Sequence, residues 1–161
     1  SEKIRLALFS IVGLDRIVKA RVLDLYAGTG IFGLEALSRS AERADFVETN
    51  SKRCREIRSN LEKMGLHDKG HVVRASVPGA LSKLDGGYNL VLVDPPYDLD
   101  PWDAVLCGLV GKDLLSENAI VIAEHRANQG PFDRYGRLVR VKKRRHGDTE
   151  ISLFELEGML E

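Results

Sequence analysis

The sequence predicts an α/β fold, in which a mostly parallel sheet of seven strands has helices on both faces and ends in an antiparallel hairpin. Three observations lead to this prediction. Short apolar runs alternate with amphipathic stretches along most of the chain. Residues 22–33 pass from an apolar run through glycines into a helical pattern, which is typical of a strand, a tight turn and a helix. Further on, two extended segments flank Gly147-Asp148, as in a hairpin.

The individual elements follow from periodicity. Apolar or alternating runs predict strands at 22–26, 44–48, 71–75, 88–93, 119–124, 137–144 and 150–156. Apolar residues at helical spacing predict helices at 1–12, 31–39, 51–64, 78–84 and 102–110. Gly13 and Gly65 are expected to end the first and third of these helices. Because strands and helices alternate, we expect consecutive strands to lie parallel and to be joined by crossover helices.

Composition indicates one ordinary globular domain over residues 1–161. Of the 161 residues, 43% are hydrophobic and 30% are charged, enough for a core without disulfides or metals. The formal net charge is zero, so nucleic-acid binding would require local clusters of basic residues. Cys54 and Cys107 lie in unrelated contexts, which indicates a reducing compartment. The sequence shows no apolar run of membrane-spanning length and no signal peptide, so we expect a cytoplasmic protein.

The glycine-rich turn indicates a nucleotide-like ligand. Gly28-x-Gly30-x-x-Gly33 matches the dinucleotide fingerprint, with Glu48 about 20 residues further on. Glycines let the backbone lie against a ligand, and amides at a helix start can hold polar groups. Alone, the motif fits NAD, FAD and adenosyl cofactors as well as plain strand–turn–helix packing. Asp24 at the strand end favours a ligand with an ammonium or sulfonium charge, and S-adenosylmethionine has both.

A second motif, Asp94-Pro95-Pro96-Tyr97, ends the predicted strand 88–93. Two prolines cannot continue a central strand, so the chain must leave the sheet at its carboxyl edge. Ligands bind at that edge in open α/β sheets, beside the first glycine turn. The two motifs are therefore expected to meet in space.

Together these motifs resemble those of class I S-adenosylmethionine-dependent methyltransferases that modify an exocyclic amino nitrogen of a base, which have a Rossmann-like fold. The resemblance covers nearly the whole chain and is greatest to the RsmD-type methyltransferases, which methylate N2 of a guanine in bacterial 16S ribosomal RNA. The supporting stretches are residues 4–9, 24–30, 33–39, 93–97 and 144–149. The resemblance implies S-adenosyl-L-methionine as cofactor and 16S rRNA, or an assembly intermediate of the small ribosomal subunit, as partner. We expect a monomer that needs no membrane.

The resemblance and the chemistry of an aromatic amine assign roles to the second motif. The amine lone pair is delocalised into the ring, so the enzyme must turn it toward the methyl donor. Asp94 and the carbonyl of Pro95 would accept the two N–H hydrogens. Pro96 would stiffen the loop, and Tyr97 would stack on a flipped-out base. This step needs no metal.

For the cofactor, the resemblance implies that Glu48 accepts the ribose hydroxyls and that Asp24 holds the methionine ammonium. The expected cofactor-binding residues are Asp24, Tyr26, Gly28, Gly30, Glu48, Thr49, Ser76 and Val77. Ser76 departs from the family pattern, which usually has an aspartate there to accept from the adenine amino group. We therefore expect a cofactor affinity weaker by roughly 1–2 kcal/mol.

For RNA, the sequence has one dense basic run. The expected RNA contacts are Lys142, Lys143, Arg144, Arg145 and His146 of this run, together with Arg5. The alternative explanation is an exposed edge strand protected by charge. RsmD-type proteins also use an N-terminal β-hairpin to bind RNA. We do not expect that hairpin here, because the sequence begins with the predicted helix 1–12.

Other functions stay open at this point. A methyltransferase acting on adenine or on a protein glutamine would share the fold, although Asp94 in place of asparagine argues against glutamine and the closing hairpin argues against adenine. A dinucleotide oxidoreductase fits poorly, because it would lack a substrate domain and a role for Asp94–Tyr97. A non-catalytic module that binds S-adenosylmethionine is compatible with the altered Ser76.

Overall fold

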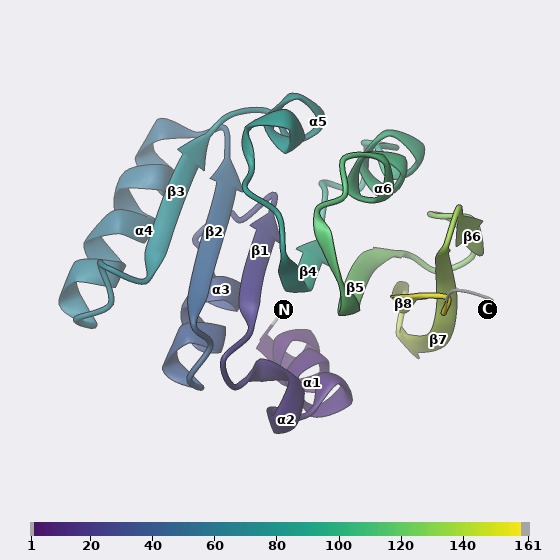
Figure 1. Cartoon of the computed structure of the whole chain (residues 1–161), viewed down its shortest axis with the longest axis horizontal. Coiled ribbons are helices and arrows are strands. Elements are labelled where there is room, and N and C mark those ends of the chain that lie inside the picture. The colour runs from purple at the N-terminus through teal and green to yellow at the C-terminus, as the bar shows by residue number, and fades with distance from the viewer. Residues whose placement is uncertain (1, 159–161) are drawn as a thin grey trace.

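The computed structural model describes residues 2–158, with side chains from Ile4 onward, and shows a sheet in the order β3-β2-β1-β4-β5-β8-β7-β6 (Figure 1). The strands are β1 Arg21–Leu25, β2 Arg43–Glu48, β3 Gly70–Arg74, β4 Tyr88–Val93, β5 Leu115–Arg126, β6 Arg134–Tyr135, β7 Leu138–His146 and β8 Thr149–Leu156. Strands β1 to β5 run parallel. Strands β8, β7 and β6 continue the sheet antiparallel to their neighbours. The predicted fold class is confirmed.

Helices cover both faces of the sheet, as predicted. They are α1 Glu2–Val12, α2 Leu14–Ile17, α3 Ile31–Ser38, α4 Ser51–Lys63, α5 Val77–Ala80, the 3-10 turn η1 Leu81–Lys83, and α6 Trp102–Gly111. Apolar side chains of α1 to α4 form one buried cluster against the sheet, and those of α5, η1 and α6 form another on the opposite face. Figure 1 shows α1 and α2 on one side of β4 and β5, and α5 and α6 on the other.

The first strand–turn–helix unit depends on two glycines that lie close to neighbouring side chains. Gly30 has φ +79°, and a Cβ at this position would lie 2.8 Å from Cγ1 of Ile57. A Cβ at Gly33 would overlap the ring of Phe46, which is fully buried in β2. Both glycines therefore let α3 pack closely against its neighbours, as close helix–strand packing requires.

The predicted number of seven strands is wrong, because the sheet has eight strands among residues 2–158. The additional strand, β6, consists of Arg134 and Tyr135 and pairs with Leu138 and Val139. Two residues are too few to show an alternating pattern, so periodicity could not reveal this strand. It is anchored by tertiary contacts. The buried Tyr135 lies edge-on to the ring of Phe154, and its hydroxyl accepts the N–H of Phe132 at 2.8 Å.

Strand β5 is also longer than predicted, since it begins at Leu115 and not at residue 119. Its early residues are polar and hide the strand pattern. The amide of Asn89 in β4 donates to Ser116 Oγ and to Asn118 Oδ1, both at 3.0 Å. These side-chain bonds connect the polar start of β5 to β4, ahead of the apolar residues that pair from Leu90 and Ile120 onward. The one-turn helix α2, which periodicity did not predict, is fixed by the buried Ile17.

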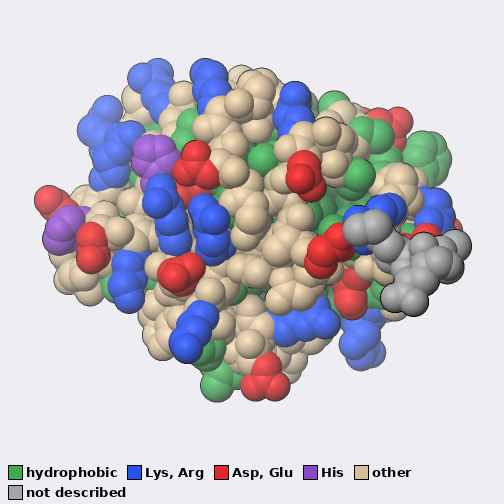
Figure 2. Space-filling model, viewed as in Figure 1, with side chains coloured by type: hydrophobic (Ala, Val, Ile, Leu, Met, Phe, Trp, Pro, Cys, Tyr) green, Lys and Arg blue, Asp and Glu red, His purple; other side chains and the backbone are tan. Residues whose placement is uncertain are grey.

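The carboxyl ends of the parallel strands lie at one edge of the sheet. The glycine turn follows β1 and the Asp-Pro-Pro-Tyr loop follows β4, so both motifs lie at this edge. On the face shown in Figure 2, basic and acidic side chains are interspersed, in keeping with a formal net charge of zero. Across the described part of the chain, every helix is too short or too polar to span a bilayer.

Candidate active site

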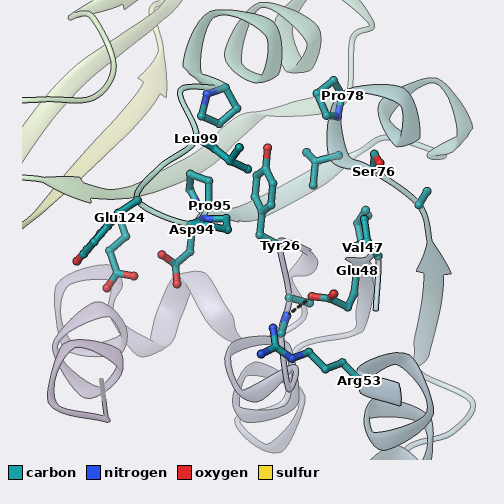
Figure 3. A pocket seen from close by; sticks show the side chains of 18 of the residues that line it. Tyr26, Val47, Glu48, Arg53, Ser76, Pro78, Asp94, Pro95, Leu99 and Glu124 are labelled. Atoms are coloured by element: carbon teal, nitrogen blue, oxygen red, sulfur yellow. Dashed lines mark hydrogen bonds between the residues drawn. The ribbon is translucent and has the colours of Figure 1, made fainter. Parts of the chain in front are cut away.

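A cavity of about 900 Å³ lies along the carboxyl edge of the sheet, between the turn after β1, the end of β2, the start of α5 and the loop after β4 (Figure 3). The predicted site residues that line it are Arg5, Tyr26, Gly28, Glu48, Thr49, Ser76, Val77, Asp94, Pro95, Pro96 and Tyr97. The glycine turn and the Asp-Pro-Pro-Tyr loop therefore face the same space.

The remaining predicted site residues lie elsewhere. Asp24 and Gly30 are not part of the cavity lining. Gly30 begins α3 and packs on Ile57. Residues 142–146 lie in β7, outside the cavity, with exposed side chains.

Glu48, at the end of β2, has a carboxylate that is fixed by backbone groups. Its Oε1 accepts the N–H of Gly28 at 2.8 Å, and its Oε2 accepts the N–H of Asn50 at 2.8 Å. The residue is only 7% exposed, yet it borders the cavity next to Tyr26 (Figure 3). Each carboxylate oxygen has a further lone pair, so the group can accept hydrogen bonds from a bound diol.

Asp24 lies beneath the glycine turn, with 1% of its surface exposed. Its Oδ2 accepts the N–H of Gly33 at 3.1 Å, in the first turn of α3. A carboxylate at this end of a helix is favourable, because the free amides and the helix dipole are positive there. Burial nevertheless raises the pKa of Asp24 to about 7, against the opposing effects of the Gly33 N–H and the nearby charge of Arg5. Asp24 thus supports the turn from below, outside the cavity lining.

Asp94 and Glu124 form a pair of carboxyl groups, one directly after β4 and the other in β5, one residue beyond the final pair of β5 with β4. Both line the cavity, and in Figure 3 their side chains lie next to each other and point the same way. Burial raises the pKa of Asp94 to about 9, helped by a hydrogen bond with Glu124 and by the charges of Glu124 and Asp24. Asp94 therefore keeps its proton near neutral pH in the absence of a ligand.

Tyr97 is held from two sides. Its hydroxyl forms a hydrogen bond of 2.6 Å with Oγ1 of Thr149, the first residue of β8. The guanidinium carbon of Arg126 lies 4.9 Å from the ring centroid, in cation–π geometry. The side chain is still 49% exposed. A fixed aromatic ring with open area at the cavity mouth provides a surface on which a base can stack.

The basic hairpin lies on the same rim as the Asp-Pro-Pro-Tyr loop. Thr149 pairs with Arg126 of β5 and with His146 of β7. The bond between Tyr97 and Thr149 therefore joins the loop to the tip of the β7–β8 hairpin. Residues 142–146 lead into that tip.

A second cavity, of about 320 Å³, lies on the other side of the loop after β4. The rings of Trp102 and His125, 5.8 Å apart and edge to face, contribute to its wall, as do Arg126 and Gln129. The two cavities share the loop from Pro95 onward, and they also share Glu124. The carboxylate of Glu124 thus lies where the two cavities adjoin.

Sequence reasoning did not assign several residues of the site. Glu124, Arg126 and Thr149 are brought to Asp94 and Tyr97 by strand pairing across the sheet. For Glu124, the available signal was an acid directly after an apolar strand, the same pattern that identified Glu48 and Asp94. Among the described residues, no group of three or more His, Cys, Asp or Glu side chains could hold a metal ion.

Comparison with known proteins places the chain in a family. The model of the family described as "Conserved hypothetical protein 95" matches residues 1–155. The chain belongs to this family. Its predicted resemblance to the RsmD-type group is confirmed, because relatives in the family are named as ribosomal RNA methyltransferases.

Two of these relatives are similar to this chain over most of its length. The Bacillus subtilis protein "Putative rRNA methyltransferase YlbH" is 30% identical over 98% of this chain and 87% of its own length. "Ribosomal RNA small subunit methyltransferase D" of Escherichia coli is 30% identical over 71% of this chain. The match to the Escherichia coli protein spans 57% of that protein's length.

Solved structures have the same fold. A conserved hypothetical protein from Streptococcus pyogenes superposes with a TM-score of 0.87 at 28% identity, over 96% of this chain and 95% of the other. SMU.776, solved in complex with SAH, superposes with a TM-score of 0.74 at 16% identity, over 96% of this chain and 48% of the other.

Proposed function

We propose that this chain transfers a methyl group from S-adenosylmethionine to the exocyclic N2 amine of a guanine in the RNA of the small ribosomal subunit. Its membership of a family with rRNA methyltransferases supports the reaction class. The observation that carries the proposal is that Glu48 and Asp94 line one cavity beside the glycine turn. One acid suits an adenosyl ribose and the other suits an amine.

The site fits the cofactor in size and in chemistry. A cavity of about 900 Å³ is in the range of small-molecule sites, roughly 300–1,000 Å³. Gly28 borders it with φ +61° and open space where a side chain would point, so a ligand can lie against the backbone. Glu48 is held in place by backbone N–H groups and offers acceptors to ribose hydroxyls. Ser76 and Val77 line the part of the cavity at the start of α5, where the adenine would lie.

When bound, S-adenosylmethionine would supply an electrophilic methyl group on a sulfonium. The chain's own contribution is to orient the amine. Asp94 and the carbonyl of Pro95 would accept its two hydrogens, which turns the lone pair out of the ring plane. Orientation of this kind contributes about 7–11 kcal/mol, more than the roughly 1.5–3 kcal/mol of one hydrogen bond to a charged group. Positioning therefore outweighs acid–base catalysis in this site.

Asp94 can also accept the proton that the amine must lose. As the nitrogen forms its bond to carbon it becomes positive, and one N–H proton must leave. An ionised Asp94 that already accepts that N–H can take the proton. This order of events requires Asp94 to be ionised when the amine arrives. The positive charges of the cofactor favour the ionised form.

The surroundings of the loop are suited to RNA. Tyr97 presents an open ring at the cavity mouth, and the exposed residues 142–146 lie on the same rim. Phosphate contacts from such a hairpin would hold the strand while one base enters the site. We propose a cytoplasmic monomer that acts on 16S rRNA or on an assembling subunit, with guanine 966 as the candidate target.

The direct test is transfer of a labelled methyl group to unmodified 16S RNA and, separately, to assembled small subunits that lack the modification. We expect N2-methylguanosine in the digested RNA from at least one of these substrates. Labelled N6-methyladenosine would instead support an adenine methyltransferase. Binding of S-adenosylhomocysteine without transfer to either RNA would favour a non-catalytic module.

A further inference from the structure

Glu124 has a position that transfer chemistry alone does not explain. In the register of β4 and β5, Val93 pairs with Ala123, so Asp94 and Glu124 follow the last paired residues of two neighbouring strands. Figure 3 shows both carboxyl groups side by side above the N-terminal helices. A single carboxylate together with the Pro95 carbonyl is sufficient to orient an amine. The position of the second carboxylate, Glu124, therefore requires a separate explanation.

Two ionised carboxylates placed together in a partly buried site are unfavourable unless a ligand supplies hydrogens for both. No described Lys or Arg side chain forms an ion pair with either group. Glu124 borders both cavities, whereas Asp94 borders only the larger one. A base held at the mouth of the second cavity, with its amine at Asp94, would therefore present its adjacent ring edge to Glu124.

The two purines differ at that edge. Next to its exocyclic amine, guanine carries N1–H, which is a donor, whereas adenine carries an unprotonated N1, which is an acceptor. We propose that Glu124 accepts the N1–H of the target guanine while Asp94 accepts a hydrogen of its N2 amine, so that Glu124 is the residue that selects guanine. This inference rests on the proposed function and deepens it, since it assigns base selection to one side chain.

The pairing also accounts for the unfavourable carboxyl pair. Guanine brings a donor to each group, so both carboxylates can ionise in the complex with their charges compensated by hydrogen bonds. Adenine would bring one donor and one acceptor. It would face the Glu124 carboxylate with a lone pair, and a buried acceptor opposite an anion is strongly disfavoured.

The test uses a short RNA carrying the guanine mapped in the transfer assay, and a second RNA with 2-aminopurine at that position. 2-Aminopurine keeps the exocyclic amine in place but has no N1–H. For the natural chain we expect kcat/KM to be about 10- to 150-fold lower on 2-aminopurine, as for loss of one hydrogen bond to a charged group. Glu124→Ala should lower kcat/KM on guanine while leaving 2-aminopurine nearly unaffected, so that the ratio approaches one.

Glu124→Gln is the second variant, because it keeps shape and an acceptor oxygen but removes the charge. We expect an intermediate preference for guanine. Glu117→Gln, an exposed acid at the other end of β5, is the matched control and should leave the ratio unchanged. Calorimetry with S-adenosylhomocysteine verifies that each variant is folded, with an expected Kd within about threefold of the natural chain.

Two results would overturn the inference while the proposed function stands. One is a natural chain that methylates guanine and 2-aminopurine equally well. The other is a Glu124→Ala chain that is slower on both substrates by the same factor, since that would make Glu124 a support for Asp94 and not a reader of the base. A natural chain that transfers no methyl group to any RNA would remove the proposed function, and the inference with it.

Discussion

At the scale of single residues, the proposed function assigns cofactor binding and methyl transfer to different side chains. Glu48 and Asp94 line the same cavity but come from different strands and are held by different contacts. Removing one should therefore leave the other in place. This independence gives a prediction for each part of the site.

Asp94→Ala should lower methyl transfer by about 10²–10⁴-fold, because the amine loses the group that orients it and takes its proton. Its Kd for S-adenosylhomocysteine should stay within about tenfold, since Glu48 and the glycine turn are untouched. Transfer of labelled methyl and calorimetry measure the two quantities. Asp68→Ala, an exposed acid before β3, serves as the control. Turnover close to normal in Asp94→Ala would show that the role given to Asp94 is incorrect.

Ser76→Asp should tighten cofactor binding by roughly 1–2 kcal/mol. Ser76 lines the cavity and its side chain does not cap α5, so a carboxylate there is free to accept from the adenine amino group. Ser76→Asn is the matched control, because it has an acceptor oxygen of similar reach without the charge. Calorimetric Kd values for S-adenosylhomocysteine decide the matter. An unchanged Kd in Ser76→Asp would mean that position 76 does not contact the adenine.

The sequence was informative about residues at strand ends. Glu48, Asp94 and the Asp-Pro-Pro-Tyr loop could be predicted to meet because parallel strands end at one edge. The contacts of Tyr97 with Thr149 and Arg126 could not, since they depend on which strand lies next to β5. Asp24 lies in β1, as predicted, but the sequence could not show that its carboxylate accepts the N–H of Gly33 beneath the turn and stays outside the cavity lining.

At the scale of elements, the β7–β8 hairpin connects the basic run to the Asp-Pro-Pro-Tyr loop. Its tip lies beside Arg126, and Thr149 holds the hydroxyl of Tyr97. The same two strands complete the sheet. The hairpin therefore has a structural function, and its exposed basic side chains are available for a second one.

Replacing Arg144 and Arg145 by Gln should weaken RNA binding and reduce the slope of log K against log salt by about 1–2, as expected when two phosphate contacts are lost. Cofactor affinity should not change. The control is the double variant Lys63→Gln and Lys69→Gln, which removes the same amount of charge. These two lysines lie at the end of α4 and just before β3, at the amino ends of the parallel strands. Filter binding at several salt concentrations measures the slopes. Equal slopes for both double variants would show that the basic residues do not contact RNA and only protect an exposed edge strand.

Elements with strong periodicity were predicted well, and the failures have a common cause. The helices that pack on the sheet and the buried parallel strands carry their own pattern. Strand β6 and the polar start of β5 do not, because tertiary bonds hold them: the ring contacts of Tyr135 and the amide of Asn89. Local sequence cannot report a strand whose stability comes from residues far along the chain.

At the scale of the whole molecule, the carboxyl groups of the proposed site make stability depend on pH. Asp94 has a pKa of about 9 and Asp24 a pKa of about 7 in the folded chain, whereas both are near 3.9 in an unfolded chain. Between pH 4 and 9 the folded state therefore holds protons that the unfolded state has released. Stability gained in this way is complete below about pH 4 and is lost as the pH rises through the folded-state pKa values.

We therefore expect the melting temperature of the cofactor-free chain to fall between pH 6 and 9. Each unit of pKa difference is worth about 1.4 kcal/mol, and each kcal/mol moves the melting temperature of a domain this size by roughly 2–4 °C. Asp94→Asn should melt higher than the natural chain at pH 8.5 and show a shallower decline, whereas Asp68→Asn should follow the natural chain. Fluorimetric melts at several pH values test this. S-Adenosylmethionine should also flatten the decline, because its positive charges favour ionised carboxylates. A melting temperature that is level or rises over this range, equally in Asp94→Asn, would show that the carboxyl pair carries no proton in the folded chain.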